Sequence, residues 1–466
     1  MSDHHAPPNL LFLFPDQWRW DWLGCESSPY GKVPVRTPNI DALARRGVRF
    51  THCRSNSPLC APARACLATG MRYERCGVPD NGYDLGSERT TVFNHLRDAG
   101  YRTLTCGKND LHKKTAWKGR DGWTRLLGQY GFTDAIDQSG KLDAKQWGAV
   151  DKGGPHCSYT SYLHANGQFE TYAGDYQRRA REATHFAAAW PTPLEREHYT
   201  DDFCGRTALE LLDRQPDEGP WMLWVNWPGP HDPFDPPREL QARYDGVAFP
   251  EPVAGKAEHP RNDGAAVPLN HQQIRRNYAA ACEGIDEWVG RIMDKVAQRG
   301  ELENTVVVFS SDHGEMLGDH GRFLKNVPQE GSVHVPLIIA GPGVQEGAVS
   351  DALVELIDIS ATLLEAAGLE CPGDWDALPL GSVLRGEAAD GDHREVQVSA
   401  LGAWRMICDG RYKCILHEDG EPELYDLEED PGELTNLAGD QPQRLQLLEA
   451  ALAAQTGDEN PCHARL

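Results

Sequence analysis

The stretch Ser57-Pro-Leu-Cys60-Ala-Pro-Ala-Arg64-Ala-Cys-Leu-Ala-Thr-Gly70 decides how the rest of the chain is interpreted. Cys60 follows the extended segment at Pro58 and precedes Pro62, a pattern that predicts the first turn of a helix. The free backbone N–H groups of such a turn favour an anion. Arg64 lies one turn further along the same helical face, so an oxyanion would meet both side chains. A buried cysteine beside a structural arginine is the alternative, and C-x-P-x-R alone does not exclude it.

The residues that follow Arg64 narrow this choice. Cys60-Ala-Pro-Ala-Arg64 continued by Ala-Cys-Leu-Ala-Thr-Gly70 resembles the signature of the type I sulfatases, which belong to the alkaline phosphatase superfamily. Matching segments recur from residue 9 to about residue 439, so the resemblance covers most of the chain. It implies that a maturation enzyme oxidises Cys60 to formylglycine, whose hydrated aldehyde is the nucleophile.

Short apolar runs predict the fold class. The segments 9–14, 101–106, 221–227 and 305–309 have the composition of strands that are buried on both faces of a parallel sheet. Helical segments lie between them, which favours a doubly wound, mostly parallel α/β sheet of the alkaline-phosphatase-like kind.

Two domains are expected from a chain of 466 residues. The first is a sulfatase catalytic domain over residues 1–370. The second is a smaller C-terminal α+β subdomain over residues 371–466, with a small antiparallel sheet and a terminal helix. Residues 113–200 are rich in Trp and Tyr and have the least regular pattern, so we expect an aromatic insertion that shapes a substrate pocket or lid.

Polar residues after two of the predicted strands indicate a cation site. Asp16 and Gln17 follow the first strand, and Asp312 and His313 follow the strand at 305–309. In open α/β sheets ligands bind beyond the carboxyl ends of the strands. Carboxylate and amide oxygens suit Ca²⁺, Mg²⁺ or Mn²⁺, so we expect one divalent cation, Ca²⁺ first, with Mn²⁺ favoured by the imidazole. The resemblance adds Cys60, as formylglycine, to the ligands; an ordinary Asp-Gln turn is the alternative for the first pair.

Two lysines and a histidine are expected to act on the substrate. The resemblance makes Lys108 and Lys325 the residues that bind the sulfate, although Lys325 as a lone charge would be a solvated surface residue. It makes His231 the residue that binds the bridging oxygen or protonates the leaving group, chemistry that imidazole supplies near neutral pH. In the family, one hydroxyl of the hydrated aldehyde attacks sulfur and the second then expels sulfate.

Three residues keep alternative assignments. Sulfatases commonly read Gly-Lys-x-His after Gly107, but Asp110 occupies the histidine position here and His112 follows two residues later. Either His112 reaches the nucleophile or Asp110 serves it, and a surface-loop histidine is a further interpretation of His112. Asn81 precedes a glycine in a turn; the choline-sulfatase and phosphonate-monoester-hydrolase branches have a substrate-contacting asparagine in this region, and a plain turn residue is the alternative.

The predicted activity is hydrolysis of a sulfate monoester of a carbohydrate or other small alcohol. Gln17 with His313 resembles the choline-sulfatase and phosphonate-hydrolase branches, and some carbohydrate sulfatases also have the histidine. A phosphonate monoester or phosphodiester hydrolase on the same scaffold is therefore the alternative. A two-metal phosphatase is disfavoured because position 60 is neither Ser nor Thr. A non-enzymatic protein with a decayed site is disfavoured because the motif residues are intact.

The composition limits which partners and which cellular compartment are expected. The formal net charge of −24 argues against nucleic-acid and anionic-membrane partners. The apolar run 10–14 has no basic flank, and thirteen cysteines without a C-x-x-C pair do not suggest a disulfide framework. We therefore expect a cytoplasmic enzyme whose partners are a small-molecule or saccharide sulfate ester and the maturation enzyme, with homo-oligomer formation left open.

Overall fold

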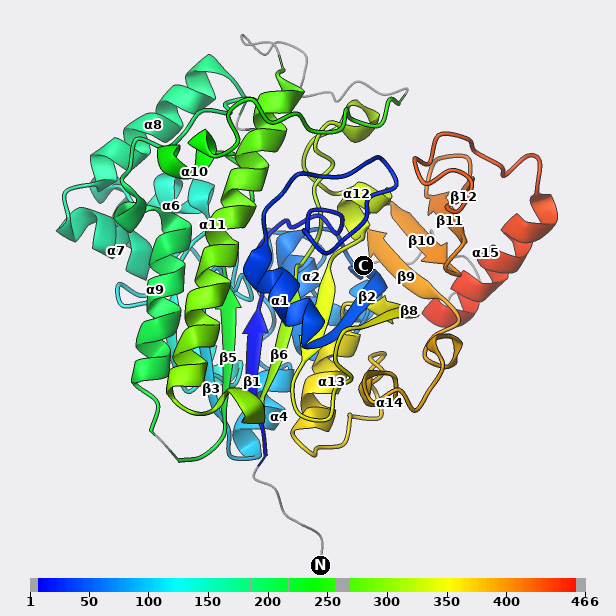
Figure 1. Cartoon of the computed structure of the whole chain (residues 1–466), viewed down its shortest axis with the longest axis horizontal. Coiled ribbons are helices and arrows are strands. Elements are labelled where there is room, and N and C mark those ends of the chain that lie inside the picture. Colours follow the sequence, from blue (N-terminus) through cyan, green and yellow to red (C-terminus); the bar gives the residue numbers. More distant parts are fainter. Residues whose placement is uncertain (1–6, 185, 217, 256–268, 458–466) are drawn as a thin grey trace, which may run out of the picture.

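An eight-stranded sheet forms the centre of the protein (Figure 1). The computed structural model describes residues 7–184, 186–216, 218–255 and 269–457. In spatial order the strands are β4 (Asp134–Asp137), β3 (Arg102–Gly107), β5 (Trp221–Asn226), β1 (Asn9–Leu13), β6 (Thr305–Ser310), β7 (Leu337–Ala340), β2 (Gly47–Arg54) and β8 (Ala348–Glu355). Only β7 runs antiparallel to its neighbours β6 and β2. The structure thus confirms the predicted doubly wound, mostly parallel α/β fold.

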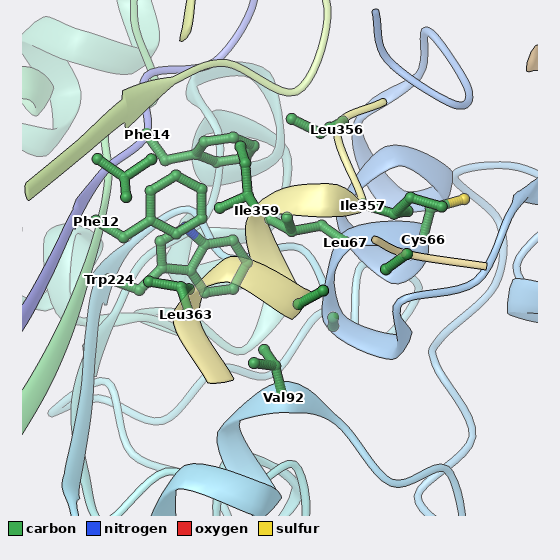
Figure 2. Packing of buried hydrophobic residues seen from close by; sticks show 14 of the residues in the cluster. Phe12, Phe14, Cys66, Leu67, Val92, Trp224, Leu356, Ile357, Ile359 and Leu363 are labelled. Atoms are coloured by element: carbon green, nitrogen blue, oxygen red, sulfur yellow. The ribbon is translucent and has the colours of Figure 1, made fainter. Parts of the chain in front are cut away.

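Helices cover both faces of this sheet, because successive side chains of a buried strand point to opposite faces. Leu10 and Phe12 of β1 belong to the core shared with α2 (Cys60–Thr69), α4 (Val92–Asp98) and α13 (Asp358–Ala366). Figure 2 shows this layer. Leu11 and Leu13 belong to the core shared with α1 (Pro38–Arg45), α9 (Thr200–Asp213) and α11 (His271–Gln298). The apolar run that predicted β1 is therefore buried on both sides.

The segment 113–200 is more helical than expected. It contains α5 (Arg125–Gln129), α6 (Lys141–Trp147), α7 (Ser158–Ala165) and α8 (Phe169–Glu182). Phe169, Tyr172, Ala173 and Tyr176 lie in one buried cluster with residues of α6 and α7. Their spacing of three and four residues is that of a helical stripe, so many of the aromatic residues form a core of their own. The glycines and charges between them obscured this period in the sequence.

A second, four-stranded antiparallel sheet lies in the C-terminal part (Figure 1). Its order is β12 (Glu423–Asp426), β11 (Tyr412–His417), β10 (Trp404–Cys408) and β9 (Gln397–Leu401). Leu448 and Leu452 of the terminal helix α15 (Pro442–Thr456) pack against it. Leu380 and Leu384, beyond the expected boundary at residue 370, belong to the same core as β1.

Short helices complete the described part of the chain. They are α3 (Tyr73–Cys76), α10 (Arg238–Ala242), α12 (Glu330–Val333) and α14 (Gly381–Leu384). Across the described residues, we find no helix with both the length and the apolar character needed to cross a bilayer.

Candidate active site

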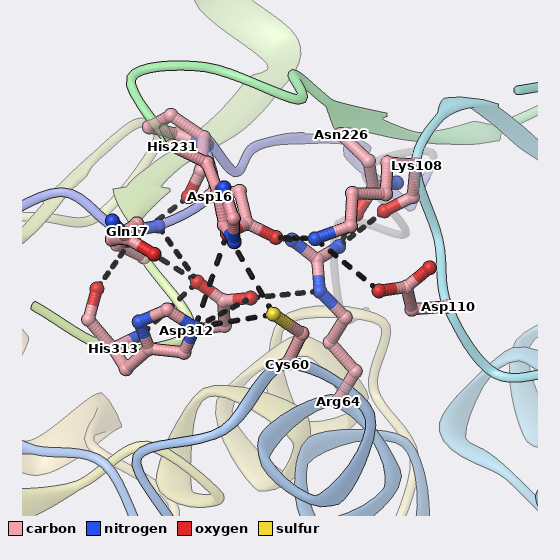
Figure 3. A network of polar contacts seen from close by, with 12 residues as sticks. Asp16, Gln17, Cys60, Arg64, Lys108, Asp110, Asn226, His231, Asp312 and His313 are labelled. Atoms are coloured by element: carbon pink, nitrogen blue, oxygen red, sulfur yellow. Dashed lines mark hydrogen bonds and ion pairs between the residues drawn. The ribbon is translucent and has the colours of Figure 1, made fainter. Parts of the chain in front are cut away.

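The ends of four strands and the start of one helix meet at one edge of the large sheet (Figure 3). Asp16 follows β1, Lys108 follows β3, His231 follows β5 and Asp312 follows β6. Cys60 is the first residue of α2, and the preceding Leu59 has extended backbone angles. Parallel strands end at the same edge, so residues far apart in the chain are brought together there.

Two carboxylates, a thiol and an imidazole form a buried cluster at this edge. One ligand atom from each of Asp16, Cys60, Asp312 and His313 lies within 4.8 Å of the other three. The Cys60 Sγ is 3.3 Å from His313 Nε2 and 3.8 Å from Asp16 Oδ1. His313 Nδ1 lies 3.0 Å from the carbonyl oxygen of Gly314 and donates to it, so Nε2 is the ring nitrogen that faces the cluster. These donors fit a divalent cation.

Gln17 is held at every polar atom. Its backbone N–H donates to Asp312 Oδ1 at 3.0 Å, and its carbonyl oxygen accepts from the Tyr278 hydroxyl at 2.6 Å. Its side-chain Nε2 donates to Glu315 Oε2 at 2.5 Å. The amide oxygen therefore points away from Glu315 and accepts from the ammonium of Lys325. The left-handed backbone of Gln17 (φ 68°) allows the side chain to turn back toward the site.

Arg64 contacts the two aspartates. Its Nε donates to Asp312 Oδ2 at 2.9 Å and its Nη2 to Asp16 Oδ2 at 3.1 Å. Its Nη1 donates to the carbonyl oxygen of Lys108 at 2.6 Å and to Asn226 Oδ1 at 2.7 Å. The fully buried guanidinium thus has four of its five N–H groups engaged within the protein. Arg64 thus contacts both carboxylates directly, and its predicted contact with an oxyanion stays a prediction.

Two ammonium groups lie close to the cluster. Lys108 contacts Asp16 and lies 3.3 Å from Asp110 Oδ2, while Lys325 contacts Gln17. Burial and Asp16 raise the pKa of the Cys60 thiol, but Lys108, Lys325 and His313 outweigh them and hold that pKa well below its ordinary value. Position 60 is therefore an environment that stabilises an anion.

His231 is oriented by its neighbour Asp232. The Nδ1 atom lies 2.7 Å from the carbonyl oxygen of Asp232 and 3.0 Å from its Oδ1. The other ring nitrogen, Nε2, lies 2.6 Å from Lys325 Nζ. Burial and Lys325 lower the pKa of His231, yet Asp232 and hydrogen bonding with Cys60 prevail and raise it to about 9. The imidazole can therefore carry a proton near neutral pH.

Asn81 and Asp110, two of the residues with alternative assignments, both lie close to the site. Asn81 Oδ1 accepts from the backbone N–H of Ala61 at 3.0 Å, at the start of α2. Asp110 lies between Lys108 and Lys113, whose Nζ is 2.9 Å from Asp110 Oδ2.

His112 is fully buried, which corrects the interpretation of a surface-loop histidine. Its Nε2 faces Asp137 Oδ2 at 3.5 Å, and no described contact joins it to Cys60. Burial first, and Lys118 second, lower the pKa of His112 well below its ordinary value.

The sequence interpretation missed several supporting residues. Asn226 is the last residue of β5 and accepts a hydrogen bond from Arg64. The expectation that site residues lie at the carboxyl ends of strands could therefore have identified it. Glu315 stands three residues after Asp312 and binds Gln17, a partner nearly three hundred positions away that no local pattern reveals. A cavity of about 550 Å³ is lined in part by His231 and Lys325, two of the predicted site residues.

Comparisons with known proteins show the family of this chain. Residues 8–369 match the family model described as Sulfatase, and residues 318–456 match the model described as N-sulphoglucosamine sulphohydrolase, C-terminal. The chain belongs to the sulfatase family. It is a hydrolase that acts on sulfate esters.

Relatives of this sulfatase cover nearly its whole length. The choline-sulfatase of Rhizobium meliloti is 31% identical over 92% of this chain and 82% of its own length. The N-acetylglucosamine-6-O-sulfatase of Bacteroides thetaiotaomicron is 28% identical over 95% of this chain and 86% of its own. The phosphonate monoester hydrolase of Agrobacterium radiobacter has the same fold, with a TM-score of 0.78 at 24% identity over 97% of this chain and 95% of the other.

Proposed function

We propose that this sulfatase hydrolyses the sulfate monoester of a carbohydrate or other small alcohol, using formylglycine made from Cys60 and one divalent cation. The observation that carries the proposal is the buried cluster of Asp16, Cys60, Asp312 and His313, with ligand atoms within 4.8 Å of one another. The named activities of the choline and N-acetylglucosamine relatives support an alcohol or saccharide ester.

Asp16, Gln17, Asp312 and His313 would hold the cation, with position 60 as a further ligand. When present, the cation and the hydrated aldehyde of formylglycine would supply positive charge and the attacking hydroxyl. The oxygen-rich set favours Ca²⁺, while the single imidazole keeps Mn²⁺ and Mg²⁺ as alternatives. Arg64 would hold both aspartates in place, since it binds each of them directly.

Lys108 and Lys325 would bind the sulfate and stabilise the charge that develops as the ester bond breaks. An ammonium group has donors only, so in the 2.6 Å contact with Lys325 the Nε2 of His231 acts as the acceptor. When Lys325 turns to a sulfate oxygen, Nε2 becomes able to carry a proton.

His231 would then protonate the departing alcohol from Nε2. Its Nδ1 stays bound to Asp232, which fixes the ring and favours the imidazolium form. This role suits alcohols that leave poorly as alkoxides.

Peptide mass spectrometry combined with activity tests this function. The protein is expressed with and without a formylglycine-generating enzyme, and the fraction of Cys60 converted to the aldehyde is compared with the turnover of 4-nitrophenyl sulfate. We expect activity to follow the converted fraction and Cys60→Ala to be inactive. Full activity in protein that carries only the thiol would contradict the proposal.

Phosphonate monoester or phosphodiester hydrolysis is the second candidate. Gln17 and His313 favour it by resemblance to the phosphonate-hydrolase branch, although the choline-sulfatase branch resembles the chain at the same two positions. All three ester types carry one negative charge at the reacting centre, so the two lysines alone do not select among them. Relative kcat/KM for 4-nitrophenyl sulfate, bis(4-nitrophenyl) phosphate and a phenylphosphonate monoester would separate the candidates; a preference for sulfate supports the first.

A further inference from the structure

We infer that Lys141 is a positioning residue for His231: through a buried ion pair with Asp235, it holds the loop 228–235, which follows β5 and carries the imidazole. The inference rests on the proposed function, since it assumes that His231 protonates the departing alcohol. Among the described contacts, none joins the ammonium of Lys141 to the ring of His231, so Lys141 acts through the loop.

The ammonium group of Lys141 has an acceptor for each of its three N–H groups. It donates to Asp235 Oδ1 at 2.9 Å, to the carbonyl oxygen of Pro233 at 3.1 Å and to the Tyr199 hydroxyl at 3.0 Å. The side chains of Lys141 and Asp235 are each 1% exposed. Two of the three bonds end on the loop, so a buried charge of α6 links this loop to the segment 113–200.

The carboxylate of Asp235 is bound on both oxygens. Tyr176 of α8 donates to Oδ2 at 2.9 Å, and the Tyr199 hydroxyl donates to Oδ1 at 3.3 Å. Tyr176 belongs to the buried aromatic cluster formed with residues of α6 and α7, so that cluster reaches the loop. Without these partners the buried carboxylate would be costly, because charges are stable inside a protein only when they are paired.

The carbonyl of Pro233 lies one residue beyond the groups that orient His231. Nδ1 of His231 contacts the carbonyl oxygen and the Oδ1 of Asp232, and the next residue in the chain is Pro233. The backbone N–H of Asp235 also donates to the Pro233 carbonyl, at 2.9 Å, which closes a tight turn. A movement of this turn would therefore move the Asp232 carbonyl, and with it the imidazole.

A second contact holds the loop on the other side of His231. The backbone N–H of Gly229 donates to Asp201 Oδ1 at 2.7 Å, and Asp201 lies at the start of α9. The loop is thus held two residues before His231 and two residues after it. Displacement of a reacting group by about 1 Å can cost about 100-fold in rate, so this restraint matters for proton transfer.

The dependence of rate on the leaving group tests this role in the matured enzyme. 4-Nitrophenyl sulfate has a good leaving group and 4-methylphenyl sulfate a poor one, so a proton from His231 helps the second far more. The kcat/KM of the first divided by that of the second therefore measures how well the acid is placed. A merely structural role of Lys141 would lower both values alike and leave this ratio unchanged.

Lys141→Met combined with Asp235→Asn removes both charges of the pair at once. Lys141→Met alone would leave the carboxylate buried without its cation and destabilise the fold. In the double variant the new amide can still bond to the hydroxyls of Tyr176 and Tyr199, while the ammonium bond to Pro233 is lost. We expect the ratio to rise about tenfold, a part of the 10²- to 10⁴-fold that general-acid help is typically worth.

Two tyrosines of the same buried cluster provide a milder test and its control. Tyr176→Phe removes the hydroxyl that donates to Asp235, whereas Tyr159→Phe removes one that donates to the carbonyl oxygen of His198 at 2.9 Å. We expect the ratio to rise about two- to threefold in Tyr176→Phe, the lower end of what one hydrogen bond contributes, and to stay unchanged in Tyr159→Phe. An unchanged ratio in whichever of the test variants folds, or the same rise in Tyr159→Phe, would overturn the inference.

A background without the imidazole shows whether Lys141 acts through His231. His231→Ala should raise the ratio by itself, and adding Lys141→Met with Asp235→Asn should then raise it no further. A further rise of the same size, or no rise in His231→Ala, would overturn the inference.

The two esters also separate this inference from the proposed function. If the matured enzyme hydrolyses both and the ratio does not respond to the variants, only the inference is wrong. If it hydrolyses neither ester, the proposed function is wrong as well.

Discussion

Glu315 fixes the side-chain amide of Gln17, with 2.5 Å between Oε2 and Nε2. The other carboxylate oxygen of Glu315 accepts from the backbone N–H groups of Leu317 at 3.1 Å and Leu324 at 2.6 Å. Glu315 thus has donors on both oxygens, and Gln17 can present only its oxygen to the site. A residue outside the cation cluster decides which atom of Gln17 faces that cluster.

Exchange of Glu315 for glutamine should reverse this orientation. In Glu315→Gln the new amide oxygen would accept from the two backbone N–H groups, so its NH₂ would face Gln17. Gln17 would then turn its oxygen to residue 315 and its NH₂ to the cation site. We expect cation affinity to fall about 10- to 100-fold, as for other residues that orient metal ligands. Calorimetric titration with Ca²⁺ measures this without turnover.

A second substitution provides the control for that prediction. In the double variant Gln17→Glu with Glu315→Gln, a carboxylate oxygen can accept from residue 315 while the other faces the cation. We expect affinity to recover. No recovery, with both variants folded, would mean that Glu315 only stabilises the fold.

Asp312→Asn should remove the cation and weaken the fold together. Asp312 is fully buried and accepts from Arg64, Gln17 and the backbone N–H of His313. The loss of one partner of a buried ion pair typically costs about 3–5 kcal/mol. Metal analysis should find far less than one ion per chain, and denaturant unfolding should show the lower stability. Asp374→Asn, at an exposed acid outside the cluster, is the control and should change neither; stoichiometric metal in Asp312→Asn would contradict the assignment.

His231→Ala should affect substrates according to their leaving groups. A phenolate departs with little need of a proton, whereas an alkoxide needs one. General-acid help is typically worth about 10²- to 10⁴-fold, so the loss of kcat/KM should be larger by that order for alkyl sulfates than for 4-nitrophenyl sulfate. Equal losses on both substrate types would show that His231 positions the sulfate.

The pH dependence of alkyl sulfate hydrolysis should reflect the same proton. The pKa of His231 is raised to about 9, in part by Asp232, and the protonated ring is the acid. Activity should therefore hold below pH 9 and fall as the pH rises through about 9. Asp232→Asn removes a charge that raises this pKa, so the fall should move to lower pH. If the fall in activity at alkaline pH occurs at the same pH in Asp232→Asn as in the unchanged enzyme, a group other than His231 is titrating.

Much of the site follows from local sequence patterns. The apolar side chains of β1, β3, β5 and β6 are buried as predicted, and a polar residue follows each strand. These polar residues meet because parallel strands end at one edge of the sheet. The helix that begins at Cys60 follows from the prolines around it. These features depend on residues within a few positions of one another, so the chain alone was sufficient to predict them.

The contacts between these elements were decided by the tertiary structure. Arg64 was predicted to lie behind Cys60, but its engagement with Asp16 and Asp312 depends on two strand ends that approach from elsewhere. The burial of His112 depends on how its loop packs beside Asp137. The buried cluster of the segment 113–200 likewise depends on the packing of the aromatic side chains of α8 against α6 and α7. Sequence spacing by itself determined which residue types stand at strand and helix ends. Only the packing of the folded chain decided which of them meet, because those pairs are separated by as many as 308 positions in the sequence and no local period connects them.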